Sequence, residues 1–373
     1  MAGLYIHIPF CVSKCSYCDF YSCTSTANTD DFVSALRREM RARKEYLGEQ
    51  PVKTIYFGGG TPSLLSISQI ETIFDEIYGN FTVQPEEVTL EANPDDLSAI
   101  YLADLVKTPI NRLSIGIQSF DDSDLRLMNR RHTAAQAEAA IGRAQAAGFD
   151  NISADLIFGI PGMDDRTWER NINKMLSLGV QHISAYHLTI EEGTRFGRMA
   201  QRGDIKAVDE DTSERQYEML RRMLGTAGFE HYEISNFALP GRRAIHNSSY
   251  WRGTPYLGLG PSAHSYDEHE RRVCTADTDL YIRQSPSPEM FETETLTPED
   301  MRNEYVMVHL RCATGIDVGD FKSKFGLEAT DKLFHRAEKF IRDGLLRNEN
   351  GHIYVPCEKF LISDRIISDL FDV

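Results

Sequence analysis

Strand-like and helix-like segments alternate along the first half of the chain, and this alternation limits the possible folds more than any other feature. Strands that alternate with helices form parallel sheets. Because six βα units are fewer than the eight of a closed TIM barrel, we predict an open, partial (β/α)6 barrel of the α/β class. Amphipathic patterns predict helices over residues 30–46, 66–78, 133–148 and 165–178. The six predicted strands are residues 4–8, 54–57, 87–91, 112–117, 151–158 and 182–187.

Three cysteines directly follow the first predicted strand. Cys11, Cys15 and Cys18 have the spacing C-x3-C-x2-C. Thiolates this close in sequence can hold one compact centre, and three of them would leave one iron of a cubane without a protein ligand. A structural zinc site is the main alternative, but it needs four ligands, and Cys23 and His7 fall outside the usual zinc spacings. The pattern favours a [4Fe-4S] cluster with an open iron over zinc and over three unrelated thiols.

The other predicted strands also end in residues that suit a ligand site. In α/β barrels, chemistry takes place at the carboxyl ends of the strands. Three glycines, residues 58–60, follow the second strand and would let backbone groups approach a ligand, although a tight turn explains them equally well. The other strands end in polar side chains, and each of these alone could cap its strand. Because all of them would lie around one mouth of the barrel, together they favour a ligand site. These polar residues are Glu91, Gln118, Asp155, Tyr186 and His187.

The composition is that of an ordinary globular protein, and its charge disfavours one class of partner. Among 373 residues, 40 are basic and 56 acidic, which gives a net charge of −16. Nucleic acid is therefore not expected as a partner, because phosphate binding depends on Lys and Arg. We find neither a long apolar run nor a leader, and the seven cysteines are an odd number. We expect a cytoplasmic protein without a transmembrane segment, with peripheral membrane contact left open.

Five segments, taken in order, match a known group of proteins. They are residues 4–20, 56–62, 114–120, 129–130 and 155–162. Together they resemble the radical S-adenosylmethionine (radical SAM) superfamily and, within it, the oxygen-independent coproporphyrinogen III oxidase group. The resemblance implies that Cys11, Cys15 and Cys18 ligate a [4Fe-4S] cluster whose open iron chelates SAM. The residues it implies beside the cluster and SAM are Tyr5, Tyr17, Gly59, Gly60, Thr61, Glu91, Gln118, Arg130 and Asp155.

Two departures distinguish the sequence from the true oxidase branch of this group. That branch resembles C-x3-C-x2-C-x-C, whereas here Phe20 stands two residues beyond Cys18, and Cys23 stands five beyond it. That branch also carries a long arm before its cysteines, whereas ten residues precede Cys11. Both departures favour the HemW-type heme chaperone branch, which is understood to bind heme and deliver it to apoproteins.

Two enzymatic alternatives remain. A coproporphyrinogen III dehydrogenase would use a 5'-deoxyadenosyl radical to abstract hydrogen from propionate side chains before decarboxylation. Radical SAM modification of RNA or of a cofactor is disfavoured by the acidic balance of the chain. We therefore expect heme and an apo-hemoprotein recipient as partners, with no prediction of the oligomeric state.

A run with the pattern H-N-x-x-Y-W follows the predicted barrel. It extends from His246 to Trp251 and is similar to a run associated with heme binding in the HemW branch. Heme needs an axial ligand, commonly histidine, and apolar walls, which His246, Tyr250 and Trp251 could supply. Alternatively, His246 hydrogen-bonds a loop and the two aromatic residues fill the core. His187 and His264 are the other candidate axial ligands.

The pattern changes again near residue 297. Residues 298–310 and 329–343 are expected to be helices, and residues 344–355 a hairpin with its turn at 348–351. This order resembles a small winged-helix-type appendage, for which the acidic chain favours a lid or partner surface over DNA binding. The predicted domains are the barrel, a post-barrel segment with the H-N-x-x-Y-W run, and the winged-helix-like part: residues 1–230, 231–285 and 286–373.

Overall fold

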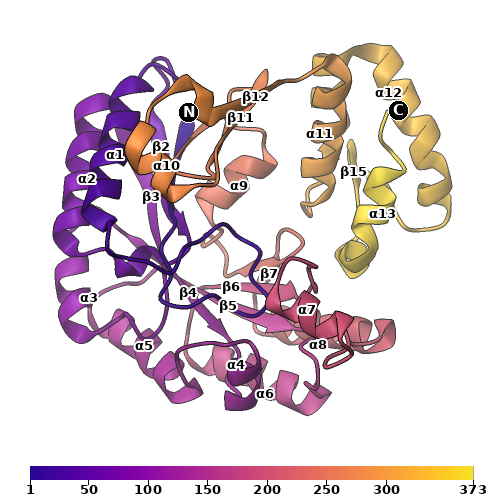
Figure 1. Ribbon diagram of the computed structural model, residues 1–373. Coiled ribbons are helices and arrows are strands. Elements are labelled where there is room, and N and C mark those ends of the chain that lie inside the picture. The colour runs from indigo at the N-terminus through magenta and orange to yellow at the C-terminus, as the bar shows by residue number, and fades with distance from the viewer. Residues whose placement is uncertain (373) are drawn as a thin grey trace.

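Six parallel strands form the centre of the molecule in a computed structural model that describes residues 1–372 (Figure 1). Each strand pairs in parallel with the next along the chain. The sheet has two free edges and does not close, so the predicted α/β partial barrel is confirmed. The strands are β1 (Ala2–Ile8), β2 (Val52–Gly59), β3 (Val83–Ala92), β4 (Arg112–Gln118), β5 (Ile152–Phe158) and β6 (His182–His187).

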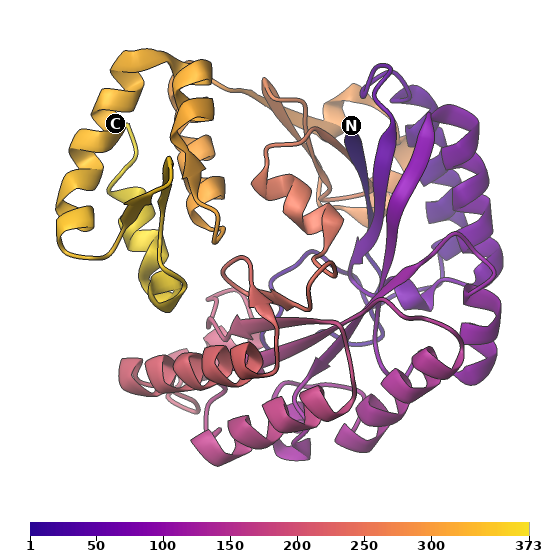
Figure 2. The same cartoon turned by 180° about the vertical axis from the view of Figure 1, so that it is seen from behind.

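Helices cover the outer side of these strands (Figure 2). Their apolar faces explain why they pack there: in the first helix Phe32, Leu36 and Met40 are fully buried. Thr133 caps the N-terminus of the fifth helix in a capping box with Gln136. The outer helices are α1 (Thr29–Ala42), α2 (Ile67–Asn80), α3 (Ala99–Leu105), α5 (Ala134–Ala146), α6 (Asp165–Ser177) and α8 (Glu210–Thr226). Two short helices, α4 (Asp122–Leu127) and α7 (Arg195–Gln201), lie next to the loop that follows β1.

The post-barrel segment continues the same sheet on both edges and makes it twelve-stranded. On one edge β9 (Tyr256–Leu259) pairs in parallel with β1, and β10 (His264–Tyr266), β11 (Glu270–Cys274) and β12 (Phe291–Thr295) follow it in antiparallel pairs. On the other edge β8 (Asn236–Ala238) and β7 (Glu230–His231) follow β6. Strand β12 lies beyond residue 285, the end of the expected post-barrel segment. The large sheet thus extends past that expected boundary.

Two shorter helices accompany these added strands. Helix α10 (Thr278–Gln284) and the 3-10 turn η2 (Pro288–Met290) connect β11 to β12. Helix α9 (Ile245–Trp251) contacts β2 and β3. It lies on the inner side of the curved sheet, across from the outer helices (Figure 2).

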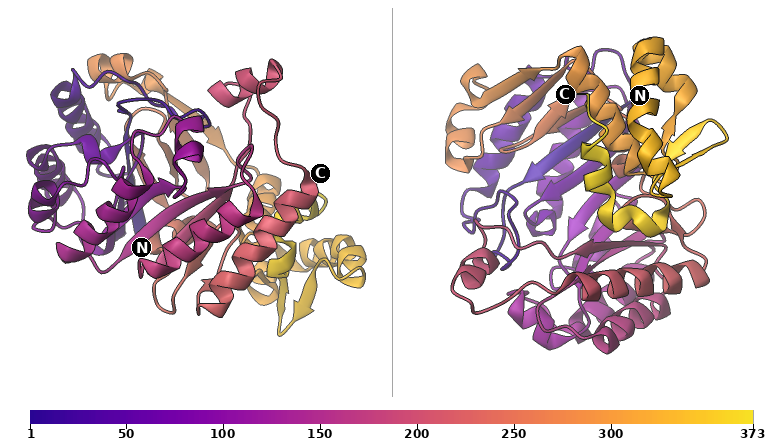
Figure 3. Two further views of the ribbon diagram at one scale, coloured as in Figure 1. Left: turned by 90° about the horizontal axis from the view of Figure 1, so that it is seen from below. Right: turned by 90° about the vertical axis from the view of Figure 1, so that its right-hand side faces the viewer.

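The last part of the chain lies to one side of the barrel (Figure 3). It contains α11 (Pro298–Leu310), α12 (Val318–Arg342), α13 (Ser363–Ser368) and a three-stranded sheet of β13 (Ile316–Asp317), β15 (His352–Tyr354) and β14 (Arg347–Glu349). The hairpin turns at Asn350 and Gly351, both with positive φ, as predicted. Gly326, with φ of 85°, interrupts α12, so the helix expected over residues 329–343 begins after a kink.

Hydrogen bonds attach this part to the barrel. The Tyr217 hydroxyl donates to the Cys357 carbonyl at 2.8 Å, and the Ile234 N–H donates to the Arg311 carbonyl at 3.1 Å. We also searched residues 1–372 for membrane spans, and none of the helices there has the length and apolar content to cross a membrane.

Candidate functional site

The three motif cysteines share the loop that follows β1, and backbone hydrogen bonds close this loop. The Cys11 N–H donates to the Cys23 carbonyl at 2.9 Å, and the Cys23 N–H donates to the Pro9 carbonyl at 2.7 Å. The Ser16 N–H donates to the Met128 carbonyl at 2.9 Å, which ties the middle of the loop to the end of α4. Cys23 therefore supports the loop through its backbone, and its thiol is not needed for that role.

The thiols in this loop have the chemistry of cluster ligands. None of them forms a disulfide. The Thr61 hydroxyl donates to Cys11 Sγ at 3.4 Å, and Arg130 Nη1 donates to Cys15 Sγ at 3.3 Å. Burial, with smaller contributions from the nearby Cys15 and Cys11, raises the pKa of the Cys18 thiol to about 11. Within residues 1–372 no three metal-binding side chains surround a common point. The donor set fits a sulfur-ligated cluster because three thiols share one loop and two of them accept hydrogen bonds from Thr61 and Arg130; cluster binding would have to draw the three thiolates together.

The glycines at the end of β2 are required by close packing against β1 and the start of the cysteine loop. A Cβ on Gly60 would lie 2.6 Å from the Phe10 carbonyl oxygen and 2.9 Å from that of Ile8. Gly59 has φ of 106°, and a Cβ there would lie 2.6 Å from the His7 ring. Packing against the chain therefore explains both glycines. Their contact with SAM remains a prediction.

Two carboxyl groups face the interior of the barrel near its mouth. Glu91 Oε1 accepts a hydrogen bond from the Tyr56 hydroxyl at 2.7 Å, and Oε2 accepts one from the Gly59 N–H at 3.2 Å. Burial raises the pKa of Glu91 to about 7 and that of Asp155 to about 6. Asp155 Oδ1 is buried and has no hydrogen-bond partner within residues 1–372. A buried acceptor of this kind indicates that a donor from outside the chain belongs there.

Arg130 is held by the protein rather than free for a ligand carboxylate. Its Nη2 donates to Asn93 Oδ1 at 2.6 Å and to the Gly116 carbonyl at 2.7 Å, while Nη1 reaches Cys15. Arg130 therefore joins the end of β4 to the cysteine loop. Only its Nε lacks a partner.

The remaining predicted residues also lie around the mouth. Tyr5 stacks against Tyr56 with ring centroids 6.1 Å apart. Burial is the main cause of the raised pKa of Tyr17, which Arg130 opposes and the nearby Cys15 increases. Gln118 ends β4 with φ of 67°. Tyr56 was not among the predicted site residues. Its position two residues before Gly58 on β2 places both residues on the same face of the strand, because side chains alternate along a strand.

His246 lies inside the sheet, one step from the mouth residues toward the start of the strands, and its ring stacks on that of Tyr56 with centroids 5.0 Å apart. The backbone N–H groups of Ile245 and His246 donate to the Glu87 carboxylate at 2.7 and 3.0 Å, which anchors α9 to β3. The His246 ring pairs with the Thr54 hydroxyl at 2.8 Å through Nδ1 and with the Tyr250 hydroxyl at 2.8 Å through Nε2. Burial lowers the pKa of His246 to about 3, and the side chain is 1% exposed. No ring nitrogen is free for iron in this arrangement, which matches the alternative interpretation of the H-N-x-x-Y-W run.

The other two candidate histidines differ in their surroundings. His187 Nε2 lies 2.9 Å from the Ser213 hydroxyl, and its ring packs edge-on against Phe158. The His264 ring is exposed and makes no hydrogen bond within residues 1–372. It lines a cavity of about 1010 Å³ between the sheet edge and the C-terminal helices, and Phe20 lines the same cavity.

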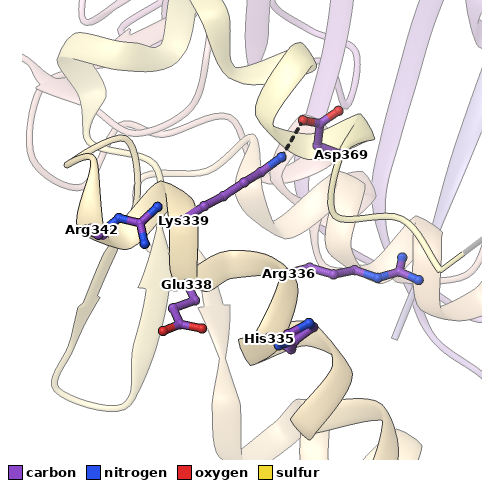
Figure 4. A pocket seen from close by; sticks show the side chains of 6 residues that line it. All are labelled: His335, Arg336, Glu338, Lys339, Arg342 and Asp369. Atoms are coloured by element: carbon purple, nitrogen blue, oxygen red, sulfur yellow. Dashed lines mark hydrogen bonds and ion pairs between the residues drawn. The ribbon is translucent and has the colours of Figure 1, made fainter.

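A smaller hollow of about 290 Å³ lies between α12 and the end of α13 (Figure 4). Two of its charged side chains are held in ion pairs: Lys339 Nζ lies 3.1 Å from Asp369, and Arg336 lies 3.0 Å from Asp372. Its lining is entirely charged or polar and has no apolar wall, so we do not treat the hollow as a candidate site.

Comparison with known families matches two parts of the chain. Residues 5–175 match the model of the radical SAM superfamily, and residues 296–361 match the HemN C-terminal domain. The first match contains the cysteine loop and the five strands from β1 to β5. The second contains α11, α12 and the small sheet.

Curated proteins resemble the whole chain. The heme chaperone HemW of Bacillus subtilis is 35% identical over 98% of this chain and 98% of its own length. HemW of Mycobacterium tuberculosis is 33% identical over 99% of this chain and 94% of its own length. Among solved structures, coproporphyrinogen III oxidase (HemN) from Escherichia coli superimposes with a TM-score of 0.85 over 99% of this chain and 90% of its own, at 22% identity. At that identity the structural match establishes the fold alone.

Proposed function

Since this chain belongs to the HemW heme chaperone family of the radical SAM superfamily, we propose that it binds heme and delivers it to an apo-hemoprotein. The observation that carries the proposal is similarity to HemW proteins over nearly the full length of both chains. Phe20, which stands where the oxidase branch has a fourth cysteine, also supports it. The cytoplasm is the proposed location.

The cofactor site of the proposal is the mouth of the barrel. Cys11, Cys15 and Cys18 would hold a [4Fe-4S] cluster. The iron without a protein ligand would bind SAM through its amino and carboxylate groups. The unpartnered oxygen of Asp155 would accept a hydrogen bond from a SAM hydroxyl. Glu91, already bonded by Tyr56, would add a second acceptor. The other side chains and glycines proposed around SAM and the cluster are Tyr5, Tyr17, Gly59, Gly60, Thr61, Gln118 and Arg130.

Replacing Asp155 by alanine is expected to weaken SAM binding about tenfold or more. The substitution removes an acceptor of a charge-assisted hydrogen bond, which contributes roughly 1.5–3 kcal/mol. Anaerobic calorimetry on cluster-loaded protein would measure the affinity. Asp150→Ala is the matched control, because the Asp150 side chain is 82% exposed. Unchanged SAM affinity in folded Asp155→Ala would contradict the barrel-mouth site.

The proposed function predicts heme transfer without porphyrinogen turnover. Cluster-loaded protein with bound heme should transfer that heme to apomyoglobin, so that the Soret band of myoglobin appears as the heme band of the donor protein disappears. The same preparation, given SAM, a reductant and coproporphyrinogen III under anaerobic conditions, should produce no protoporphyrinogen IX by chromatography. Robust turnover would favour the dehydrogenase alternative, and failure to bind heme would overturn the chaperone proposal.

A further inference from the structure

We propose that Asn93 is a positioning residue for the cluster site. Its side-chain amide holds two hydrogen-bond donors, Thr61 and Arg130, against two of the motif cysteines. Through these two donors Asn93 favours the reduced state of the bound cluster. This inference rests on the proposed function, because it concerns the [4Fe-4S] cluster that the three cysteines would hold. Asn93 was not among the predicted site residues.

The backbone of Asn93 is fixed at the mouth of the barrel. The residue directly follows β3, which ends at Ala92. Its backbone N–H donates to the Ser63 hydroxyl at 3.2 Å, and that hydroxyl donates to Asp96 Oδ2 at 2.7 Å. Ser63 lies in the 3-10 turn η1 (Pro62–Leu64), which follows β2. These bonds tie Asn93 to the loop of the neighbouring strand, so its side chain projects from a defined position.

The neighbours of the Asn93 amide decide which way it faces. A guanidinium group has only donors, so the atom that lies 2.6 Å from Arg130 Nη2 must be the carbonyl oxygen Oδ1 of Asn93. The other end of the amide is therefore its NH2 group, which donates to Thr61 Oγ1 at 3.4 Å. A reversed amide would place two donors against each other. The orientation thus follows from the chemistry of the two neighbours.

Each neighbour of the amide directs a remaining donor at a motif cysteine. Because Thr61 Oγ1 accepts a hydrogen bond from Asn93, its own O–H is left to donate, and it donates to Cys11 Sγ at 3.4 Å. Arg130 uses Nη2 on Asn93, which leaves Nη1 for Cys15 Sγ at 3.3 Å. The Thr61 side chain is buried, so bulk water does not compete for its hydroxyl. One amide therefore sets the direction of both hydrogen bonds to sulfur.

Hydrogen bonds to the sulfurs of a cluster help to set its reduction potential. Reduction adds one negative charge to the cluster and its thiolates, and an N–H or O–H donor stabilises the more negative state more strongly. Arg130 also contributes a positive charge, which acts more strongly in a site partly shielded from water. A cluster that keeps both donors is therefore easier to reduce than one that lacks them.

The same network leaves room for the proposed contacts with SAM. Arg130 Nε has no hydrogen-bond partner within residues 1–372. The Thr61 hydroxyl oxygen can accept a further hydrogen bond in addition to the one from Asn93. Positioning of the two donors and contact with SAM are thus compatible.

Asn93→Leu tests the assignment, because leucine has a similar size but no hydrogen-bonding group. In full-length protein with a full complement of iron, we expect the ratio of reduced to oxidised cluster to fall about tenfold at the potential at which the wild type is half reduced. Anaerobic potentiometry, read by the electron paramagnetic resonance signal of the reduced cluster, measures this ratio. Thr61→Val, which removes the donor to Cys11 alone, should lower the ratio by less, and Thr61→Ser, which keeps the hydroxyl, should match the wild type.

Asn80→Leu is the matched control. Asn80 is a half-buried asparagine at the end of α2, just before β3 begins and thus away from the mouth, and its Nδ2 donates to the Glu76 carbonyl and carboxylate, both at 2.7 Å. Both leucine variants should lower the melting temperature, but only Asn93→Leu should change the ratio of reduced to oxidised cluster.

The proposal is overturned if cluster-loaded Asn93→Leu keeps the wild-type ratio, or if Asn80→Leu changes it equally. Should Asn93→Leu take up no iron, Thr61→Val decides, and an unchanged ratio in that variant overturns the proposal as well. These results would leave the proposed cluster site intact, whereas a wild-type protein that binds no cluster would refute that site itself.

Discussion

Replacing Cys11, Cys15 or Cys18 by alanine is expected to reduce the iron content of anaerobically reconstituted protein from about four per chain to almost none. Each thiol would ligate a different iron, and no other cysteine lies in a position to substitute. Cys23 is the nearest in sequence, but its Sγ points to the Ser25 carbonyl at 3.8 Å. Iron and sulfide analysis, with the charge-transfer absorbance of the cluster, would measure the effect.

Cys23→Ala is the control for this result. Cys23 closes the loop through its backbone N–H and carbonyl, both of which alanine retains. We therefore expect a full complement of iron in this variant. Loss of the cluster in Cys23→Ala would show that a fourth protein thiol occupies the iron that we assign to SAM.

Gly60→Ala is expected to destabilise the protein and to disrupt the cluster at the same time. The new Cβ would lie 2.6 Å from the Phe10 carbonyl oxygen, directly before Cys11, and 2.9 Å from that of Ile8. Both contacts are with backbone atoms, so relief requires the cysteine loop to move away from β2. Overpacking of this kind costs about 1–3 kcal/mol. Denaturant unfolding of the apoprotein and iron content after reconstitution would measure the two effects.

Gly79→Ala is the matched control. Gly79 lies in α2, and a Cβ there meets no atom within 4 Å. Because alanine favours helix more than glycine does, this variant should unfold at equal or slightly higher denaturant concentration. If Gly60→Ala reconstitutes and unfolds like wild type, the cysteine loop is not held by its contact with β2.

The sequence by itself determined the elements whose signals are local. The six barrel strands, the cap at Thr133 and the C-terminal hairpin turn follow from patterns within a few residues. The sequence also indicated that Cys11, Cys15 and Cys18 belong to one site, because only six residues lie between Cys11 and Cys18. Glu91 and Asp155 could be placed at one mouth because parallel strands end on the same side.

Only the tertiary structure decided what depends on contacts between distant segments. β9 pairs in parallel with β1, more than 250 positions earlier in the chain, and nothing within either strand specifies that partner. The need for glycine at position 60 likewise comes from a distant segment, because a Cβ there would collide with the carbonyl oxygen of Phe10 in the loop after β1. His246 shows the difference most clearly. Its motif suggested an iron ligand, but Thr54 and Tyr250 occupy both ring nitrogens.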